Sequence, residues 1–139
     1  MKKKILWIVV LLAIDLGLKQ LFSNYYQLNE VRVWIPSILS IGYIRNYGAA
    51  FGIFQNGGFI LLVVGIVAVF IMFYILFNTS IKKRKIDYVV IVLLSSGTLG
   101  NVIDRIIFGY VIDFIQVPFL PVVGKTVFNT ADIWLNMGI

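Results

Sequence analysis

The chain of 139 residues contains no cysteine and no histidine. Without cysteine it can form no disulfide, no thiol nucleophile and no cysteine-ligated metal site. Without histidine the Ser-His-Asp and Cys-His catalytic arrangements are excluded, and the common zinc sites are excluded with them. Carboxylates are therefore the obvious titratable groups for any catalysis, and no metal site is expected.

Charged residues are also scarce, at 13% of the chain, whereas 60% of the residues are hydrophobic. Soluble globular domains usually carry about 25% charged residues and about 45–50% apolar ones. The apolar content instead predicts several membrane-spanning helices, each of about 20 residues. We therefore expect an all-α membrane protein, with residues 1–139 forming a single membrane domain.

Three apolar runs, at 5–22, 57–77 and 88–108, are long enough to cross a membrane. A cleaved signal peptide is the alternative for the first run, but the charges inside it and the lack of a small-residue cleavage site argue against that. A fourth helix is predicted over 130–139, which would complete a four-transmembrane-helix bundle. Because ten residues of helix extend only about 15 Å, we expect this fourth span to be incomplete and the chain to be cut short.

Seven of the twelve basic residues fall in two runs, 2–4 and 82–85, that flank predicted spans. Cytoplasmic loops are enriched in lysine and arginine, so the N-terminus and the loop 78–87 are expected inside, and the segments 23–56 and 109–129 outside. Neither run is interleaved with aromatic residues or carried on a soluble module. The net charge of +6 therefore does not predict a nucleic-acid partner.

The first outer segment contains two runs that favour β-strands. Residues 30–35 (EVRVWI) briefly alternate between polar and apolar side chains, Pro36 interrupts them, and residues 38–44 (ILSIGYI) follow. We expect a small extracytoplasmic β-sheet on the outer surface of the membrane.

Polar residues from separate segments are predicted to meet at one depth, near the outer end of the bundle. Burying ionisable groups near lipid is costly, so such residues usually face the bundle interior or an aqueous cavity and serve function. This convergence is the main functional signal that the residues give. Its members are Asp15, Lys19, Asn101, Asp104, Arg105, Asp113, Asn129 and Asp132.

Most of these residues also have a structural interpretation. Asp15 and Lys19 are spaced i, i+4, which favours an ion pair that neutralises both in the membrane. Asn101 and Asp104 lie on one face of the third span, beside glycines that permit close helix approach. They could serve only to join helices, and Asp104 could form an ion pair with Arg105.

Asn129 and Asp132 have the spacing of a helix N-cap and an acidic first turn. Asp113 is harder to explain structurally, because it is a lone carboxylate in the apolar stretch GYVIDFIQ. If Asp113 met Asp132, like charge and partial desolvation would raise one pKa, so that one carboxylate could act as a base on water and the other as an acid. Such a pair cleaves peptides without histidine, cysteine or metal.

Four blocks of the sequence resemble the lipoprotein signal peptidases, in the order and at the spacings of that family. The resemblance implies four transmembrane helices with a small extracytoplasmic sheet, in the bacterial cytoplasmic membrane. It also implies cleavage of prolipoproteins before their diacylglyceryl-modified cysteine, without a cofactor, by a chain that contacts membrane lipids and acts as a monomer. The blocks are 15–19 (DLGLK), 46–52 (NYGAAFG), 97–114 (GTLGNVIDRIIFGYVIDF) and 128–132 (FNTAD).

Position by position, the resemblance implies that Asp113 and Asp132 form the catalytic pair. Two other hypotheses remain open on the residues alone: an ion- or proton-coupled transporter, which would distribute polar residues across the membrane, and a non-catalytic helical subunit. The remaining residues are expected to shape the site or position substrate, namely Asp15, Lys19, Asn46, Gly48, Asn101, Asp104, Arg105 and Asn129.

Overall fold

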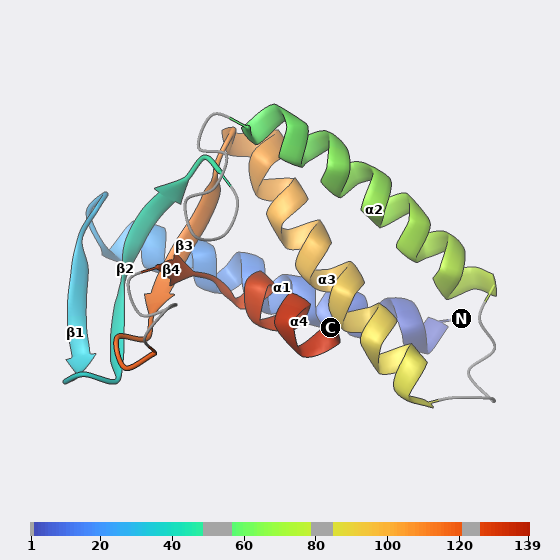
Figure 1. Ribbon diagram of the computed structural model, residues 1–139, viewed down its shortest axis with the longest axis horizontal. Coiled ribbons are helices and arrows are strands. Elements are labelled where there is room, and N and C mark those ends of the chain that lie inside the picture. Colours follow the sequence, from blue (N-terminus) through green and yellow to red (C-terminus); the bar gives the residue numbers. More distant parts are fainter. Residues whose placement is uncertain (1, 49–56, 79–84, 121–125) are drawn as a thin grey trace.

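Three long helices, one short helix and a small sheet make up the described part of the protein (Figure 1). The computed structural model describes residues 2–48, 57–78, 85–120 and 126–139. The helices are α1 (Lys2–Tyr25), α2 (Gly58–Asn78), α3 (Lys85–Phe108) and α4 (Thr130–Gly138). The strands are β1 (Val31–Ile35), β2 (Leu39–Asn46), β3 (Val111–Gln116) and β4 (Val127–Phe128).

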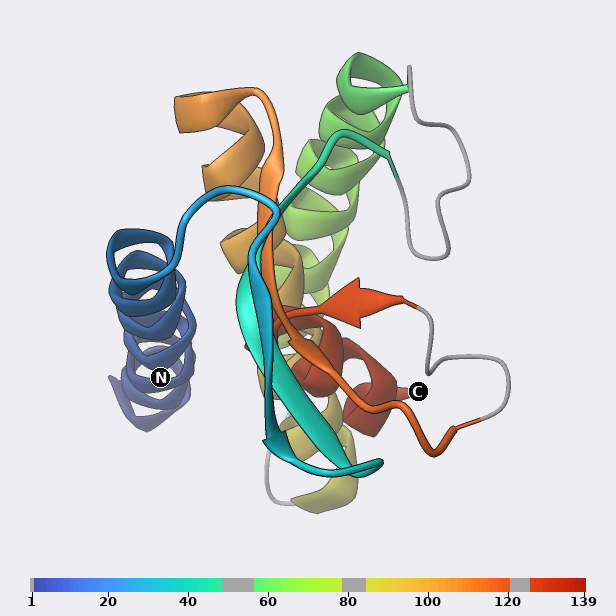
Figure 2. The same cartoon turned by 90° about the vertical axis from the view of Figure 1, so that its left-hand side faces the viewer.

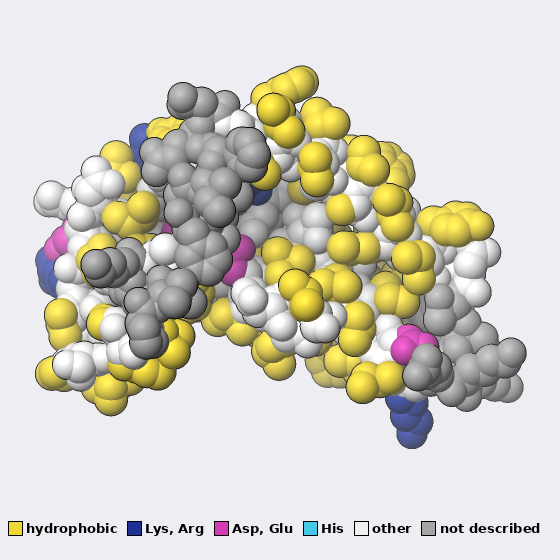
Figure 3. All heavy atoms as spheres, in the orientation of Figure 1, with side chains coloured by type: hydrophobic (Ala, Val, Ile, Leu, Met, Phe, Trp, Pro, Cys, Tyr) yellow, Lys and Arg dark blue, Asp and Glu magenta, His cyan; other side chains and the backbone are white. Residues whose placement is uncertain are grey.

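Three helices in the described part of the chain are long and apolar enough to cross a membrane: Ile5–Tyr25, Gly58–Asn78 and Lys85–Phe108. Hydrophobic side chains cover much of the surface over α2 and α3 (Figure 3). The expectation of a mostly helical membrane protein with a small sheet is thereby confirmed. α4 has nine residues, which is too short for a span.

The sheet lies across one end of the long helices, with its antiparallel strands in the order β1-β2-β3-β4 (Figure 1). β1 and β2 correspond to the two runs that were expected to form strands, and they pair as an antiparallel hairpin. β3 and β4 were not expected from the sequence. β3 joins the sheet because it consists largely of β-branched and aromatic residues, which suit a pleated surface.

The two faces of the sheet meet different helices, with α1 on one side and α4 on the other (Figure 2). On the α1 side, the ring of Phe114 stacks on that of Phe22 at a centroid distance of 4.8 Å. Ile112 lies on the same face, in an apolar cluster with Tyr26. Because successive residues of a strand point to opposite faces, Asp113 points toward α4.

Glycines allow α4 to lie directly against α3. A Cβ atom on Gly97 would lie 2.5 Å from the carbonyl oxygen of Ala131, and one on Gly138 would lie 2.8 Å from the side chain of Leu94. A Cβ atom on Gly100 would collide with the carboxylate that Asp15 extends from α1. Gly97 and Gly100 are the glycines beside Asn101 and Asp104 in the sequence, and the close approach expected there brings α1, α3 and α4 together at one level.

This packing predicts opposite effects for the same substitution at two helical glycines. Gly97→Ala should destabilise the protein by about 1–3 kcal/mol, because the added methyl meets the backbone of α4. Gly17→Ala should stabilise it by up to about 1 kcal/mol, because nothing lies within 4 Å of the added atom and alanine favours helix. Thermal unfolding in one detergent measures both; equal shifts would contradict the close approach of α3 and α4.

Candidate active site

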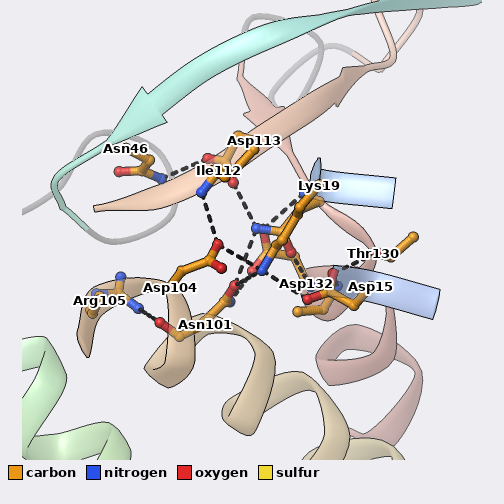
Figure 4. A network of polar contacts seen from close by, with 12 residues as sticks. Asp15, Lys19, Asn46, Asn101, Asp104, Arg105, Ile112, Asp113, Thr130 and Asp132 are labelled. Carbon is orange, nitrogen blue, oxygen red and sulfur yellow. Dashed lines mark hydrogen bonds and ion pairs between the residues drawn. The ribbon is translucent and has the colours of Figure 1, made fainter. Parts of the chain in front are cut away.

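Polar side chains from α1, β2, α3, β3 and α4 meet at the junction of the sheet with the helices (Figure 4). Hydrogen bonds of the site therefore join residues up to 116 positions apart in the chain. An acidic patch shows at the surface between the sheet and the helices (Figure 3). The convergence that the sequence predicts is present, and its hydrogen bonds specify how each element is held.

Asp113 extends from β3 toward α4 and is 2% exposed. Its carboxylate accepts two hydrogen bonds from side-chain amides, at 2.8 Å from Asn46 Nδ2 and at 2.7 Å from Asn129 Nδ2. Burial, and then the nearby negative charge of Asp132, raise the pKa of Asp113 to about 7. Near neutral pH this carboxyl group can therefore either hold or release a proton.

Asp132 lies in the first turn of α4 and completes a capping box with Asn129. The backbone N–H of Asp132 donates to Asn129 Oδ1 at 3.0 Å, and the backbone N–H of Asn129 donates to Asp132 Oδ2 at 3.2 Å. Asn101 Nδ2 donates to the other carboxylate oxygen at 2.9 Å. The cap predicted from the sequence is confirmed, and a helix N-terminus favours a negative charge at this position.

The amide of Asn129 connects the two aspartates, and its side chain is fully buried. Its Nδ2 donates to Asp113 and also to Asn101 Oδ1, at 3.2 Å, while its Oδ1 accepts from the backbone of Asp132. One side chain therefore both caps α4 and binds the carboxylate of Asp113 on the opposite side.

The ammonium group of Lys19 lies beside this pair of aspartates and is 1% exposed. It forms ion pairs with Asp15 at 2.8 Å and Asp104 at 3.0 Å, which confirms the predicted i, i+4 pair. Asp15 in turn accepts from the hydroxyl of Thr130 at 2.5 Å and from the backbone N–H of Ala131 at 2.8 Å. Asp15 thus holds the first turn of α4 against α1.

The alternative that Asp104 forms an ion pair with Arg105 is wrong. Asp104 pairs with Lys19 instead and accepts the backbone N–H of Ile112 at 3.0 Å, which fixes β3 one residue before Asp113. Consecutive helical residues point about 100° apart, so the two side chains diverge. Arg105 donates to two backbone carbonyls, at 2.8 Å to Gly48 and at 3.2 Å to Asn101.

Asn46 and Gly48 form the edge of the site at the end of β2. The backbone N–H of Gly48 donates to Asn46 Oδ1 at 3.0 Å, which orients the amide so that Nδ2 faces Asp113. Ala49 and Ala50, which follow Gly48 in the block 46–52, lie outside the described residues. All ten predicted site residues thus belong to one connected group of contacts.

Three members of the group were missed by sequence reasoning: the hydroxyl of Thr130 and the backbone N–H groups of Ile112 and Ala131. A backbone N–H group cannot be recognised from the residue types of a sequence. Thr130, in contrast, could have been recognised as a polar residue in the first turn of a capped helix. Among the described residues, no three His, Cys, Asp or Glu side chains are grouped to hold a metal ion.

The distribution of charge along the helices bears on the rival hypotheses. α2 carries no charged residue, and the charged residues of α3 lie near its two ends. The buried charges gather at the sheet end of the helices, where Asp15, Lys19 and Asp104 meet. A transporter would be expected to continue such groups across the membrane.

Comparison with known proteins gives a consistent family. A sequence model of the family described as signal peptidase (SPase) II matches residues 7–139. The lipoprotein signal peptidase of Streptococcus agalactiae serotype V is 36% identical over 94% of this chain and 82% of that protein. That of Lactobacillus gasseri is 34% identical over 99% of this chain and 88% of that protein.

Solved structures agree with the sequence comparison. A bacterial membrane enzyme solved by the in meso method matches with a TM-score of 0.86 and 30% identity, covering 99% of this chain and 83% of that one. A second such structure matches with a TM-score of 0.84 at the same identity, covering 88% of its chain. On the family match, the relatives and the shared fold, this chain belongs to the signal peptidase II family.

Proposed function

We propose that this chain removes signal peptides from prolipoproteins as an aspartic endopeptidase, with Asp113 and Asp132 as its catalytic pair. The observation that carries the aspartic mechanism is the buried amide of Asn129, which binds Asp113 and caps the turn that carries Asp132. The relatives are named lipoprotein signal peptidases, which supplies the substrate class.

The two carboxylates have different surroundings, and we assign their roles accordingly. Asp113 is almost completely buried, and this burial raises its pKa to about 7 despite the two amide donors, so we assign the proton of the pair to it. Asp132 is less buried and lies at the N-terminus of α4, where its negative charge is favoured. Asp132 is therefore the base and Asp113 the acid.

Peptide cleavage then proceeds in two steps. Asp132 removes a proton from water as the water oxygen attacks the scissile carbonyl carbon, and Asp113 gives its proton to the carbonyl oxygen. In the second step the carbon–nitrogen bond breaks, the proton on Asp132 passes to the leaving amine, and Asp113 regains a proton from the diol. Both carboxylates return to their starting states.

The surrounding residues position the pair and the substrate. Asn46 and Asn101 each donate to one catalytic carboxylate. Arg105 holds the backbone at Gly48, and its buried Nε has no acceptor in the described part of the chain. A buried donor without a partner is costly, so we assign Arg105 Nε to a carbonyl of the bound peptide.

We place the protein in the bacterial cytoplasmic membrane, with the site on the extracytoplasmic side. The start of α1, the end of α2 and the start of α3 lie opposite the sheet (Figure 1), and the basic runs of the sequence flank that end. A diacylglyceryl-cysteine could then keep its acyl chains in lipid while its peptide reaches the pair. We also propose that the protein acts as a monomer, since the contacts of the ten site residues form one connected group within a single chain.

α4 is the outer start of a fourth transmembrane helix in this proposal. It begins with a capped turn beside Asp15 and runs along α3 away from the sheet, to the middle of α3, where Gly138 packs on Leu94. With residues 1–139 as one membrane domain, the outer segments 23–56 and 109–129 carry the sheet, and the loop 78–87 is cytoplasmic.

Removing either catalytic carboxylate should abolish cleavage. Asp113→Asn and Asp132→Asn should each lower kcat/KM by at least about 100-fold, because each removes a proton-transfer group. The measurement is cleavage of a diacylglyceryl-modified prolipoprotein peptide by purified protein. Asp87→Asn makes the same change at the far end of α3 and should leave cleavage unchanged; a loss well below 100-fold in either catalytic variant would contradict the mechanism.

The raised pKa of Asp113 predicts how both activity and stability depend on pH. Cleavage should fall as the pH rises through about 7, where Asp113 loses the proton that it must donate. Between pH 3.8, the ordinary pKa of an aspartate, and about pH 7, Asp113 is protonated in the folded protein more than in the unfolded chain. The stability of the folded protein should therefore also fall as the pH rises through this range. Thermal unfolding at pH 5 and pH 8 tests this: Asp113→Asn should lose less stability than the parent.

Lys19→Met should destabilise the protein by about 3–5 kcal/mol, because Asp15 and Asp104 would stay buried without a counter-charge. The positive charge of Lys19 also lowers the pKa of Asp113, so any remaining activity should fall off at a higher pH than in the parent. Lys85→Met makes the same formal change about 24 Å along α3 from the site and serves as the control. If the activity of Lys19→Met declines at the same alkaline pH as that of the parent, Lys19 contributes to packing alone.

A further inference from the structure

An ordered cationic cluster lies on the side of β2 that the catalytic pair does not use. We define the Arg45 cluster as Tyr43, Arg45, Tyr47 and Tyr110. Arg45 Nε donates to the hydroxyl of Tyr43 at 2.9 Å, and its guanidinium lies 4.7 Å from the centre of the Tyr110 ring. The Tyr43 and Tyr110 hydroxyls are 3.3 Å apart, and the Tyr47 ring meets that of Tyr110 edge-on at 5.5 Å.

The register of the sheet separates this cluster from the site. Arg45 is paired with Ile112, whose side chain lies on the α1 side, whereas Asn46 is paired with Val111 and donates to Asp113. Adjacent residues of a strand point to opposite faces. Arg45 therefore plays no direct part in the proposed cleavage.

The cluster lies where two spanning helices end. A Cβ atom on Gly58, the first residue of α2, would be 3.2 Å from the carbonyl oxygen of Tyr47 and 3.8 Å from that of Gly109, which follows α3. The last turn of α3 exposes Ile106 and Ile107 at 61% and 64%. Those side chains face lipid in a membrane, so the cluster lies at the boundary between hydrocarbon and headgroups.

The charge of Arg45 is not neutralised by the described part of the protein, where no carboxylate forms an ion pair with it. Arg32, the other exposed arginine of the hairpin, is paired with Glu30. The aromatic rings and the Tyr43 hydroxyl hold the Arg45 guanidinium in one place, so little side-chain entropy remains to be lost when a ligand binds.

We propose that the Arg45 cluster binds the phosphate group of a membrane phospholipid. Guanidinium groups suit phosphate oxygens in charge and in forked geometry, and tyrosines are typical of the membrane interface because they have an apolar ring and a polar tip. The headgroup phosphates are the anions nearest to a cation at this boundary. A phospholipid bound there would fix the depth of β2, and with it the depth of Asn46 beside Asp113.

Native mass spectrometry of the purified chain, titrated with phosphatidylglycerol in micelles, tests the proposal without any substrate, so its outcome is independent of the peptidase assignment. Arg45→Gln should weaken binding of the tightest phospholipid by about five-fold or more, since one basic group near an anionic surface contributes that much. Arg32→Gln is the matched control, because Glu30 already neutralises that arginine, and it should bind like the parent. Equal binding by all three chains would overturn the proposal.

Two further arms identify the ligand and guard against misfolding. Inorganic phosphate at millimolar concentration should not displace the phospholipid. If it does displace the phospholipid, the site binds free phosphate instead. The second arm crosslinks the parent chain to a phosphatidylglycerol that carries a photoreactive headgroup. This arm uses no variant, so misfolding of a variant cannot affect its result. Its adducts should map to the end of β2 or to residues 108–110, and adducts found only elsewhere would overturn the assignment.

Discussion

One buried ammonium group holds the candidate site together. Lys19 contacts the carboxylates of Asp15 and Asp104 and donates to Asn101 at 3.2 Å. Each of these partners leads to a different part of the site: Asp15 to the first turn of α4, Asp104 to the backbone of β3, and Asn101 to Asp132. A charge this deeply buried costs several kcal/mol unless fully paired, so none of the three contacts can be changed alone.

The location of the Lys19 charge also suits the proposed proton transfers of Asp113 and Asp132. Within the described residues neither Asp113 nor Asp132 forms an ion pair; both accept hydrogen bonds from asparagine amides instead. A lysine bonded directly to either would favour full ionisation of the pair. Because Lys19 reaches Asp132 only through Asn101, it can position the pair and still leave a proton there.

Local spacing explains what the sequence could predict. The long apolar runs, the Asp15–Lys19 pair and the Asn129 cap each depend on residues a few positions apart, and each is present. The partner of Asp104 could not be predicted in this way, because Lys19 lies 85 positions earlier and a sequence neighbour, Arg105, offered an equally plausible charge. Likewise, the donors of Ile112 and Ala131 belong to the backbone.

β3 shows why the sheet was the least predictable part, although its register is tightly constrained. Its place between β2 and β4 depends on pairing with a strand about 70 residues away, and the β2–β3 ladder shifts register between Ile41 and Ile44. A slip of one residue would reverse every side chain. Asp113 would then enter the apolar face beside Phe22, and Ile112 would replace it beside Asn129. The burial cost of that exchange on both faces holds Asp113 in its place, so the apolar packing on α1 also fixes the position of the proposed catalytic carboxylate on the opposite side.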